Sequence, residues 1–274
     1  MHALRAILDA VFFYVLKGGC PWRLMPRDFP PSKTVYDWFR RWRIDGTWKR
    51  LNAELRDRLR SRLGRDRKNP SAGIVDSQSA KTTTGVGGNE RGFDPAKKVE
   101  ERKRHLLVDT EGLVLEARVH SAKVPDEDGI KLLLDPARNR LWQRLWQRLW
   151  HLWVDAGYQG RGRRWAEEVL GLSVAVVRKP PKPILPEKVA KAWAEEWAKE
   201  GKEVDRQRFM APKGFRVLPR RWVVERTFAW ISHNRRMAKD YERLCTTGES
   251  FVYAAMTRLM VRRLVRTKEF PDSL

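Results

Sequence analysis

Three acidic residues occupy positions from which carboxylates could hold metal ions. Asp76 ends the apolar run 73–75 and Asp155 ends the run 151–154, so each acid closes an expected β-strand. A side chain at the carboxyl end of a strand lies at the rim of a sheet, where ligands commonly bind. If the two strands are neighbours, both carboxylates come within reach of one metal. Oxygen ligands without cysteine favour Mg²⁺ or Mn²⁺, although an aspartate after a strand is more often a turn residue or a helix cap.

A third acid, Glu225, lies in a segment that we expect to be helical, with Arg221 one turn before it on the same face. An i,i+4 salt bridge between the two side chains is one interpretation. The surrounding residues 213–243 carry 9 Lys or Arg against 3 Asp or Glu. A lone acid in such a basic segment could instead share metal ions beside a phosphate track. Two metal ions would activate a nucleophile and stabilise the leaving oxygen.

The charge of the whole chain indicates the class of partner. The 274 residues include 57 Lys or Arg and 34 Asp or Glu, which gives a net charge of +23. This surplus opposes compact folding through self-repulsion unless a polyanion is the partner, so nucleic acid is favoured and a lipid surface comes second. Cys20 and Cys245 provide neither a disulfide framework nor a cysteine zinc site. The longest apolar run, 10–16, is too short to cross a bilayer.

The hydrophobic pattern predicts two kinds of structure along the chain. Residues 1–70 read as three short helices with 17 Lys or Arg against 7 Asp or Glu, which suits a DNA-binding head or a solvated packing module. From residue 71 the pattern alternates between strands and helices, as in an α/β protein with a mixed sheet. We expect strands at 73–76, 105–109, 113–119, 151–155 and 173–177, and helices at 3–16, 32–43, 47–63, 125–134, 161–170, 219–237 and 247–266. The tryptophan repeat 140–151 predicts a helix packed on the sheet, and 179–205 resembles an insertion.

Several ordered blocks resemble the Asp-Asp-Glu (DDE) transposases of bacterial insertion sequences, in the IS-four/IS-five group. The blocks are 76–83, 97–110, 155–160 and 221–230, and 20–26 with 34–48 resemble the N-terminal segment of the same group. The resemblance implies an RNase H-like fold, a mixed five-stranded sheet flanked by helices. It divides the chain into a helical N-terminal DNA-binding or packing domain at 1–70 and a catalytic domain at 71–274, with an insertion at about 179–212. Because group members usually have more chain before the first matched helix, a start truncated at Met1 is also expected.

The resemblance assigns Asp76, Asp155 and Glu225 as the catalytic metal ligands, with two Mg²⁺ or Mn²⁺ ions. It implies that water cleaves a transposon strand to leave a 3′-hydroxyl, which then attacks target DNA. The implied partners are double-stranded transposon ends and target DNA, with a homodimer or larger assembly on DNA and no membrane. We expect a cytoplasmic, nucleoid-associated location, because the two cysteines form no disulfide framework and the longest apolar run is short.

Basic side chains near these blocks are expected to contact DNA phosphates. They are Lys97, Lys98, Arg102, Lys103, Arg104, Arg221, Arg235 and Arg236. The group often shows a Tyr-x2-Arg-x3-Glu-x6-Lys signature, of which this chain keeps Arg221 and Glu225 but has Leu218 and Ser232 at the outer positions. Two alternatives stay open: an inactive transposase-derived DNA-binding protein, and a structural RNA-binding protein explained by charge alone.

Overall fold

The structure is a computed structural model that describes residues 2–67, 70–83, 90–94, 99–135, 148–178, 187–199 and 220–269. Two compact units make up the chain: residues 1–176 with 220–274, and residues 177–219. In the second unit the structure describes the helix α7 (Glu187–Lys199). No helix in these described ranges combines the length and the apolar character that a membrane span requires.

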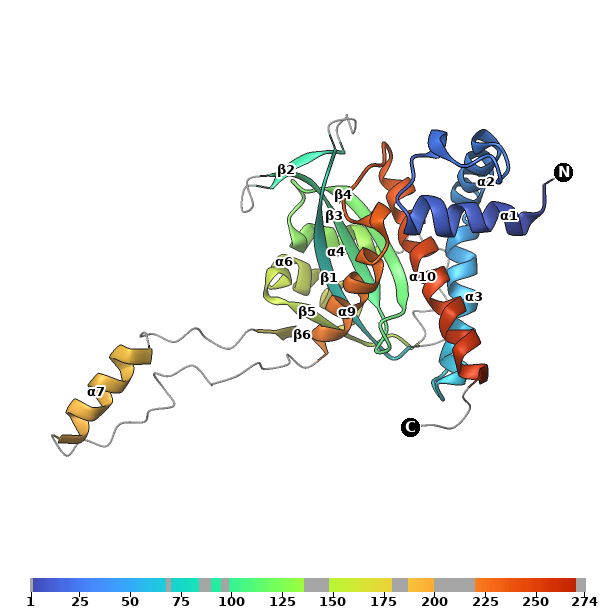
Figure 1. Cartoon of the computed structure of the whole chain (residues 1–274). Coiled ribbons are helices and arrows are strands. Elements are labelled where there is room, and N and C mark those ends of the chain that lie inside the picture. Colours follow the sequence, from blue (N-terminus) through green and yellow to red (C-terminus); the bar gives the residue numbers. More distant parts are fainter. Residues whose placement is uncertain are drawn as a thin grey trace. The chain divides into compact units, whose positions relative to one another are not determined.

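A mixed sheet forms the centre of the larger unit (Figure 1). Five strands follow the order β4-β3-β1-β5-β6, and the short strand β2 also pairs with β3, so the expected five-stranded sheet gains a sixth strand. The pairs β1–β3 and β3–β4 are antiparallel, whereas β1–β5 is parallel. The strands are β1 (Ala72–Lys81), β2 (Gly92–Asp94), β3 (Val99–Val108), β4 (Val114–Ser121), β5 (His151–Asp155) and β6 (Ser173–Val177).

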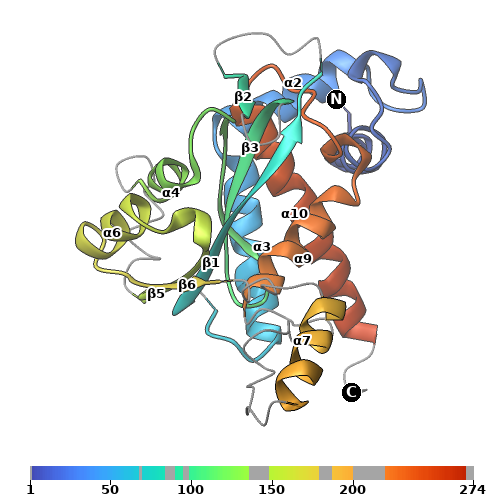
Figure 2. The same cartoon turned by 90° about the vertical axis from the view of Figure 1, so that its left-hand side faces the viewer.

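Helices cover both faces of this sheet because successive side chains of a strand point to opposite faces. Ile74 and Leu106 join one buried cluster, while their neighbours Val75 and Leu107 join a second one. The first cluster lies under α9 (Arg221–Ser232) and α10 (Cys245–Glu269), and the second under α4 (Asp126–Leu134) and α6 (Arg161–Glu168). Figure 2 shows α4 and α6 on one side of β1 and β3, and α9 and α10 on the other.

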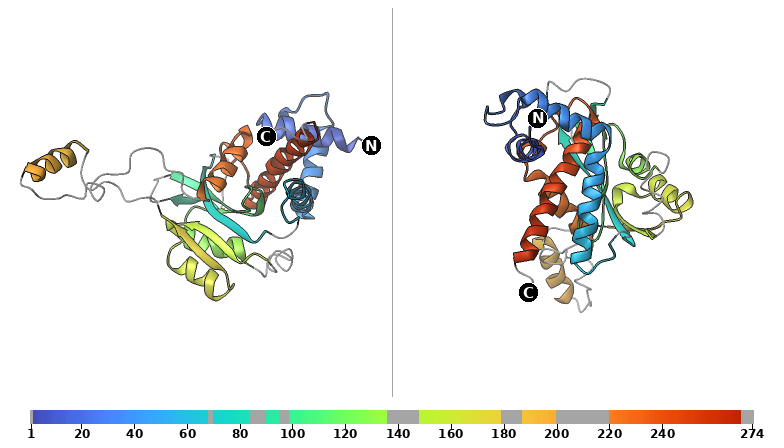
Figure 3. Two further views of the ribbon diagram at one scale, coloured as in Figure 1. Left: turned by 90° about the horizontal axis from the view of Figure 1, so that it is seen from below. Right: turned by 90° about the vertical axis from the view of Figure 1, so that its right-hand side faces the viewer.

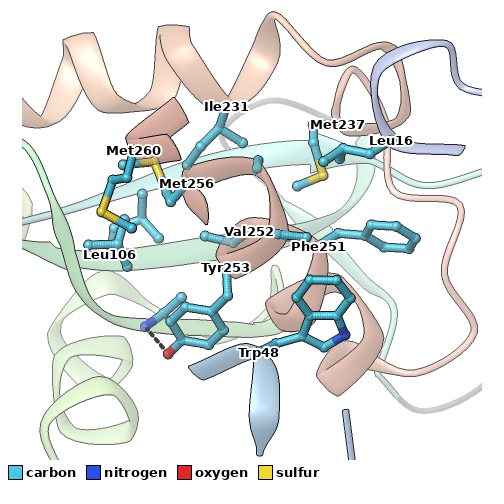
Figure 4. Packing of buried hydrophobic residues seen from close by; sticks show 14 of the residues in the cluster. Leu16, Trp48, Leu106, Ile231, Met237, Phe251, Val252, Tyr253, Met256 and Met260 are labelled. Carbon is cyan, nitrogen blue, oxygen red and sulfur yellow. Dashed lines mark hydrogen bonds between the residues drawn. The ribbon is translucent and has the colours of Figure 1, made fainter. Parts of the chain in front are cut away.

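The N-terminal helices share the first of these cores. Trp48 of α3 lies buried close to Phe251 of α10 (Figure 4). Phe39 of α2 belongs to the same cluster, and its ring stacks on that of Phe251 at 4.5 Å. In the right-hand view of Figure 3, the light-blue helix α3 and the red helix α10 run side by side. These N-terminal elements are α1 (Leu4–Asp9), the π-helix η1 (Ala10–Lys17), η2 (Trp22–Leu24), α2 (Ser32–Ile44) and α3 (Thr47–Arg62). The domain boundary at residue 70 stays a prediction.

Most predicted elements are confirmed, and several are corrected. The expected helix 3–16 is a short α-helix, α1, followed by the π-helix η1. The first strand does not end at Asp76 but continues to Lys81, because β3 pairs with it as far as Glu101. Residues 99–104, which are mostly charged, therefore belong to strand β3. The sequence did not predict this part of the strand because it contains no apolar run. The last turn of the expected helix 219–237 is a separate 3₁₀ helix, η5 (Arg235–Met237). Most of the tryptophan repeat, residues 140–147, lies outside the described residues.

The turn between β3 and β4 is fixed by a buried charge. Asp109 is fully buried, and its Oδ1 accepts the backbone N–H groups of Glu111 (2.9 Å) and Leu113 (2.8 Å). Its other oxygen pairs with the buried Arg60 guanidinium of α3. Removing one member of a buried pair leaves the other charge uncompensated, so Asp109 has a structural role in joining the hairpin to the N-terminal helices.

A second carboxylate, that of Glu249 in α10, is 13% exposed and makes stability depend on pH. It accepts the backbone N–H of Val119 at 3.1 Å and lies 3.5 Å from the Arg118 guanidinium. Burial raises the pKa of Glu249 from 4.5 to about 7. Because the folded state holds this proton more tightly than the unfolded state, the group's contribution to stability falls as pH rises from about 4.5 to 7.

Glu249→Gln should remove this penalty while its amide oxygen can still accept from Val119. Relative to the wild type, the variant should gain up to about 3 kcal/mol in free energy of unfolding between pH 5 and pH 8. Urea denaturation at both pH values measures the gap, which is the difference in free energy of unfolding between the variant and the wild type. Glu168→Gln, an exposed acid of α6, is the control and should show the same gap at both. A pH-independent gap for Glu249→Gln would contradict this account.

Candidate active site

Asp76 and Asp155 are brought together by the parallel pairing of β1 with β5. The register runs from Ala72 opposite His151 to Ile74 opposite Trp153. Continued by two residues, it sets Asp76 opposite Asp155. The pairing with β5 stops before Asp76, so this acid lies at the rim relative to β5 although its own strand continues. By the pleat of β1, Asp76 shares the face of Ile74, which is the face covered by α9.

The end of β5 orients the second acid. Asp155 caps the short 3₁₀ helix η4 (Ala156–Tyr158), and its Oδ1 accepts the backbone N–H of Gly157 at 2.8 Å. The second oxygen, Oδ2, is left to face α9, where it lies 3.5 Å from Nη2 of Arg221. The cap interpretation of Asp155 therefore holds, and it is compatible with a role in the site.

Helix α9 supplies the third acid and a cation. The helix starts at Arg221, after Arg220 in a left-handed conformation (φ 67°) with its guanidinium 5.3 Å from the Trp153 ring. The Nε atom of Arg221 lies 3.2 Å from Oε1 of Glu225 and 3.9 Å from Oδ2 of Asp76. The i,i+4 salt bridge is thus present, and the same guanidinium also meets both aspartates.

Burial dominates the electrostatics of Asp76. The pKa of Asp76 is raised from 3.8 to about 7, mainly by desolvation and in smaller part by the nearby Asp155 and Glu225 carboxylates. The backbone N–H of Ser77 (2.8 Å) and the Arg221 guanidinium act in the opposite direction. An ionised Asp76 is therefore costly at this position unless a cation stands beside it.

The donor chemistry of the site fits a divalent metal ion. Three carboxylates from β1, β5 and α9 face the guanidinium of Arg221, and carboxylate oxygens are the ligands that Mg²⁺ and Mn²⁺ prefer. In the described part of the chain, no three His, Cys, Asp or Glu side chains are already arranged to hold a metal. Arg221 stands between these acids at ion-pair distances, but its buried Nε makes no hydrogen bond to any of them.

Two arginines of the basic strand face the interior instead of solvent. Arg102 is fully buried and donates to the backbone carbonyls of Glu242 (2.6 Å) and Arg243 (3.0 Å). Arg104, 3% exposed, donates to the carbonyls of Met237 (2.7 Å) and Lys239 (3.0 Å). These bonds hold the 237–243 segment against β3, so in this structure neither guanidinium is presented to a phosphate.

The other basic residues that we expected to contact DNA differ in their exposure and in their ion pairs. Lys103 points to the opposite face, where its Nζ lies 3.2 Å from Oδ1 of Asp126. Arg236 pairs with Glu242 at 2.7 Å, whereas Arg235 is exposed. Lys97 and Lys98 lie outside the described residues.

Sequence reasoning missed the polar residues behind the acids. Ser77 follows Asp76 directly, and its hydroxyl donates to Oδ1 of Asp126 at 3.0 Å. His105 is buried at the same place, with Nε2 3.5 Å from Oδ1 of Asp126. The available signal was an aspartate at the start of the predicted helix 125–134, a position usually explained by the helix dipole.

The strand order, with two acids on adjacent strands and a glutamate on a later helix, defines an RNase H-like fold of the DDE type. The family model for the transposase DDE domain matches residues 67–260, and a model for transposases of the IS4/5 family matches residues 1–52. The chain therefore belongs to the DDE transposase family. No curated protein and no solved structure matches it.

Arg221→Gln should destabilise the metal-free protein because three carboxylates then face one another without a cation. We expect a loss of about 2 kcal/mol at low salt, less than the roughly 3–5 kcal/mol of a fully buried pair, since Glu225 is half exposed. Added Mg²⁺ should raise the melting temperature of the variant more than that of the wild type. Calorimetry measures both effects.

The matched control is Arg163→Gln, which breaks the exposed Arg163–Glu167 pair of α6 and should change stability little. Equal melting temperatures for Arg221→Gln and the wild type would show that the guanidinium does not stabilise the cluster.

Proposed function

We propose that this protein is an insertion-sequence transposase that cleaves transposon ends and transfers them into target DNA, with Asp76, Asp155 and Glu225 as metal ligands. One observation carries the proposal: the three acids, far apart in sequence, gather around the single guanidinium of Arg221. Two of the acids come from adjacent strands and the third from a helix packed on the same face. Membership of the DDE transposase family supports the same assignment.

The roles of the side chains follow from their charge and placement. Divalent ions held at such a site activate the attacking oxygen and stabilise the leaving oxygen of a phosphodiester. Asp76 and Asp155, held by paired strands, supply a rigid part of the ligand set. Glu225, with 56% of its side chain exposed, is the ligand nearest solvent and so nearest to arriving DNA. Arg221 is placed to exchange its carboxylate partners for a DNA phosphate, which a guanidinium can bind through two parallel hydrogen bonds.

DNA binding is a property that family membership implies, and the net charge of +23 agrees with it. Among the basic candidates that the structure describes, Arg235, the exposed first residue of η5, is well placed to meet a phosphate. A homodimer or larger assembly on DNA, with a cytoplasmic, nucleoid-associated location, is part of the same proposal.

Replacing each acid by its amide should abolish the chemistry and keep the shape. Asp76→Asn, Asp155→Asn and Glu225→Gln should each lower strand cleavage by a factor on the order of 10² or more, because each removes one ligand charge. DNA affinity should fall little, since no positive charge is lost. The measurement is nicking, with Mg²⁺ or Mn²⁺, of a DNA fragment that carries the sequence flanking the gene.

Glu168→Gln, which neutralises an exposed acid of α6, is the matched control and should nick like the wild type. Asp109→Asn is unsuitable as a control because that carboxylate is buried against Arg60. A triad variant that nicks as well as the wild type would exclude that residue as a ligand. A wild-type protein that binds DNA but never nicks it would favour the inactive, transposase-derived alternative.

The salt dependence of DNA binding distinguishes arginines that contact DNA from arginines that stabilise the fold. DNA affinity should weaken steeply with salt, with a log–log slope of roughly −0.9 for each phosphate neutralised. Arg235→Ala should weaken binding and make the slope shallower by about one such unit. Arg104→Ala should instead lower the melting temperature, because it leaves the carbonyls of Met237 and Lys239 without a donor. An affinity that does not change with salt would contradict phosphate binding.

A further inference from the structure

A polar cluster lies on the face of the sheet opposite the triad. Its members come from β1, β3, β4 and the first turn of α4, and they are Ser77, Lys103, His105, His120 and Asp126. The pleat places them there: Asp76 points to α9, so Ser77 points to α4, and its partner across the antiparallel pair, His105, points the same way. The triad and this cluster therefore lie on opposite faces of the same part of the sheet.

Asp126 is the centre of the cluster. Its Oδ1 accepts from the Ser77 hydroxyl at 3.0 Å and pairs with Lys103 Nζ at 3.2 Å, while Lys103 also donates to the Val124 carbonyl at 3.1 Å. The Asp126 carboxylate thus binds Ser77 of β1, the residue after Asp76, and is held in place by Lys103 of β3.

Two buried histidines, His105 and His120, lie next to Ser77 and Asp126. The two rings stack at 4.8 Å, with Nδ1 of His105 2.7 Å from Nε2 of His120 and Nδ1 of His120 2.9 Å from the Ser121 carbonyl. A carbonyl only accepts, so His120 donates from Nδ1. Burial lowers the pKa of both rings, which leaves them neutral, and His105 then donates from Nδ1 to His120. Nε2 of His105 has no proton to give, so Ser77 and Lys103 are the donors that hold Asp126.

The same turn of α4 also reaches the segment that follows Asp155. A Cβ at Gly157 would lie 3.0 Å from Oδ1 of Asp155 and 3.3 Å from Oδ2 of Asp126, so the two carboxylates converge on this glycine. The next residue, Glu127, pairs with Arg161 at 3.3 Å. The first turn of α4 therefore contacts both chain segments that carry the proposed aspartate ligands.

The first turn of α4 packs closely against β3 and α6. A Cβ at Gly129 would lie 2.3 Å from the His105 ring, a distance that real Cβ atoms do not reach, so only glycine lets α4 approach β3 this closely. A Cβ at Gly162 would lie 2.8 Å from the Glu127 carbonyl oxygen, so α6 also needs glycine at its contact with α4.

We propose that Asp126 is a positioning residue of the active site, which sets the spacing of Asp76 and Asp155 by bridging Ser77 of β1 to the Gly157 turn after β5. The inference rests on the proposed metal triad. Ligands that are held in place before the ion arrives bind it more tightly, and loss of an outer partner typically costs 10- to 100-fold in metal affinity or activity. Asp126 itself stays behind the site and touches no reacting atom.

The test is calorimetric titration of the full-length, DNA-free protein with Mn²⁺. Asp126→Ala should weaken Mn²⁺ binding about 10- to 100-fold, and Ser77→Ala should weaken it in the same direction. The double variant should be no weaker than Asp126→Ala alone by more than about twofold, because both changes break the same contact. Asp126→Asn, which keeps an oxygen for Ser77, should lie between the wild type and Asp126→Ala.

Asp128→Ala is the matched control, since it removes an acid of the same helical turn whose partners are Lys131 and Arg161, and it should leave the affinity unchanged. The metal-free melting temperature of each variant is measured alongside. A merely structural Asp126 would lower the melting temperature without changing the Mn²⁺ affinity of the folded protein, which would overturn the inference. An equal loss of affinity in Asp128→Ala would also overturn it.

Asp76→Asn separates this inference from the proposed function. If Asp76→Asn abolishes Mn²⁺ binding and Asp126→Ala leaves it unchanged, the inference fails and the triad stands. If Asp76→Asn binds Mn²⁺ like the wild type, the proposed triad fails and the inference falls with it. Should Asp126→Ala not fold, Asp126→Asn and Ser77→Ala decide, and wild-type affinity in both overturns the inference.

Discussion

The pleat of β1 is the constraint on which the rest of the structure depends. Because neighbouring residues of a strand face opposite sides, Asp76 meets α9 and Ser77 meets α4. A shift of the β1–β3 register by one residue would exchange these two faces and separate the acids. Buried apolar clusters, one with Ile74 and the other with Val75, pack against the two faces of β1.

The cluster of three acids destabilises the folded protein when no metal ion is bound. Burial and neighbouring carboxylates raise the pKa of Asp76 to about 7, so its ionised form is stabilised only by a nearby cation and by the Ser77 N–H. Arg221 is that cation in the metal-free protein. A site with this balance of charges gains stability when a divalent ion binds, because the ion satisfies carboxylates that the fold alone satisfies poorly.

The large positive charge is also divided between folding and binding. Arg60 neutralises Asp109 inside the protein, and Arg102 and Arg104 bind backbone carbonyls behind β3. These side chains contribute to the net charge of +23 but not to a basic surface. Net charge therefore indicates the class of partner, whereas burial decides which basic residues can reach it.

The sequence by itself determined the chain order of most strands and helices, and with it the elements that carry Asp76, Asp155 and Glu225, because apolar runs and helix boundaries are local patterns. It also located β5 and the β3–β4 turn, where Gly112 adopts a positive φ. Only the tertiary structure decided that Arg102 and Arg104 turn inward and that Asp126 reaches Ser77. Those contacts join residues 49 to 141 positions apart, and the pairing of distant strands that creates them leaves no periodic trace in the chain.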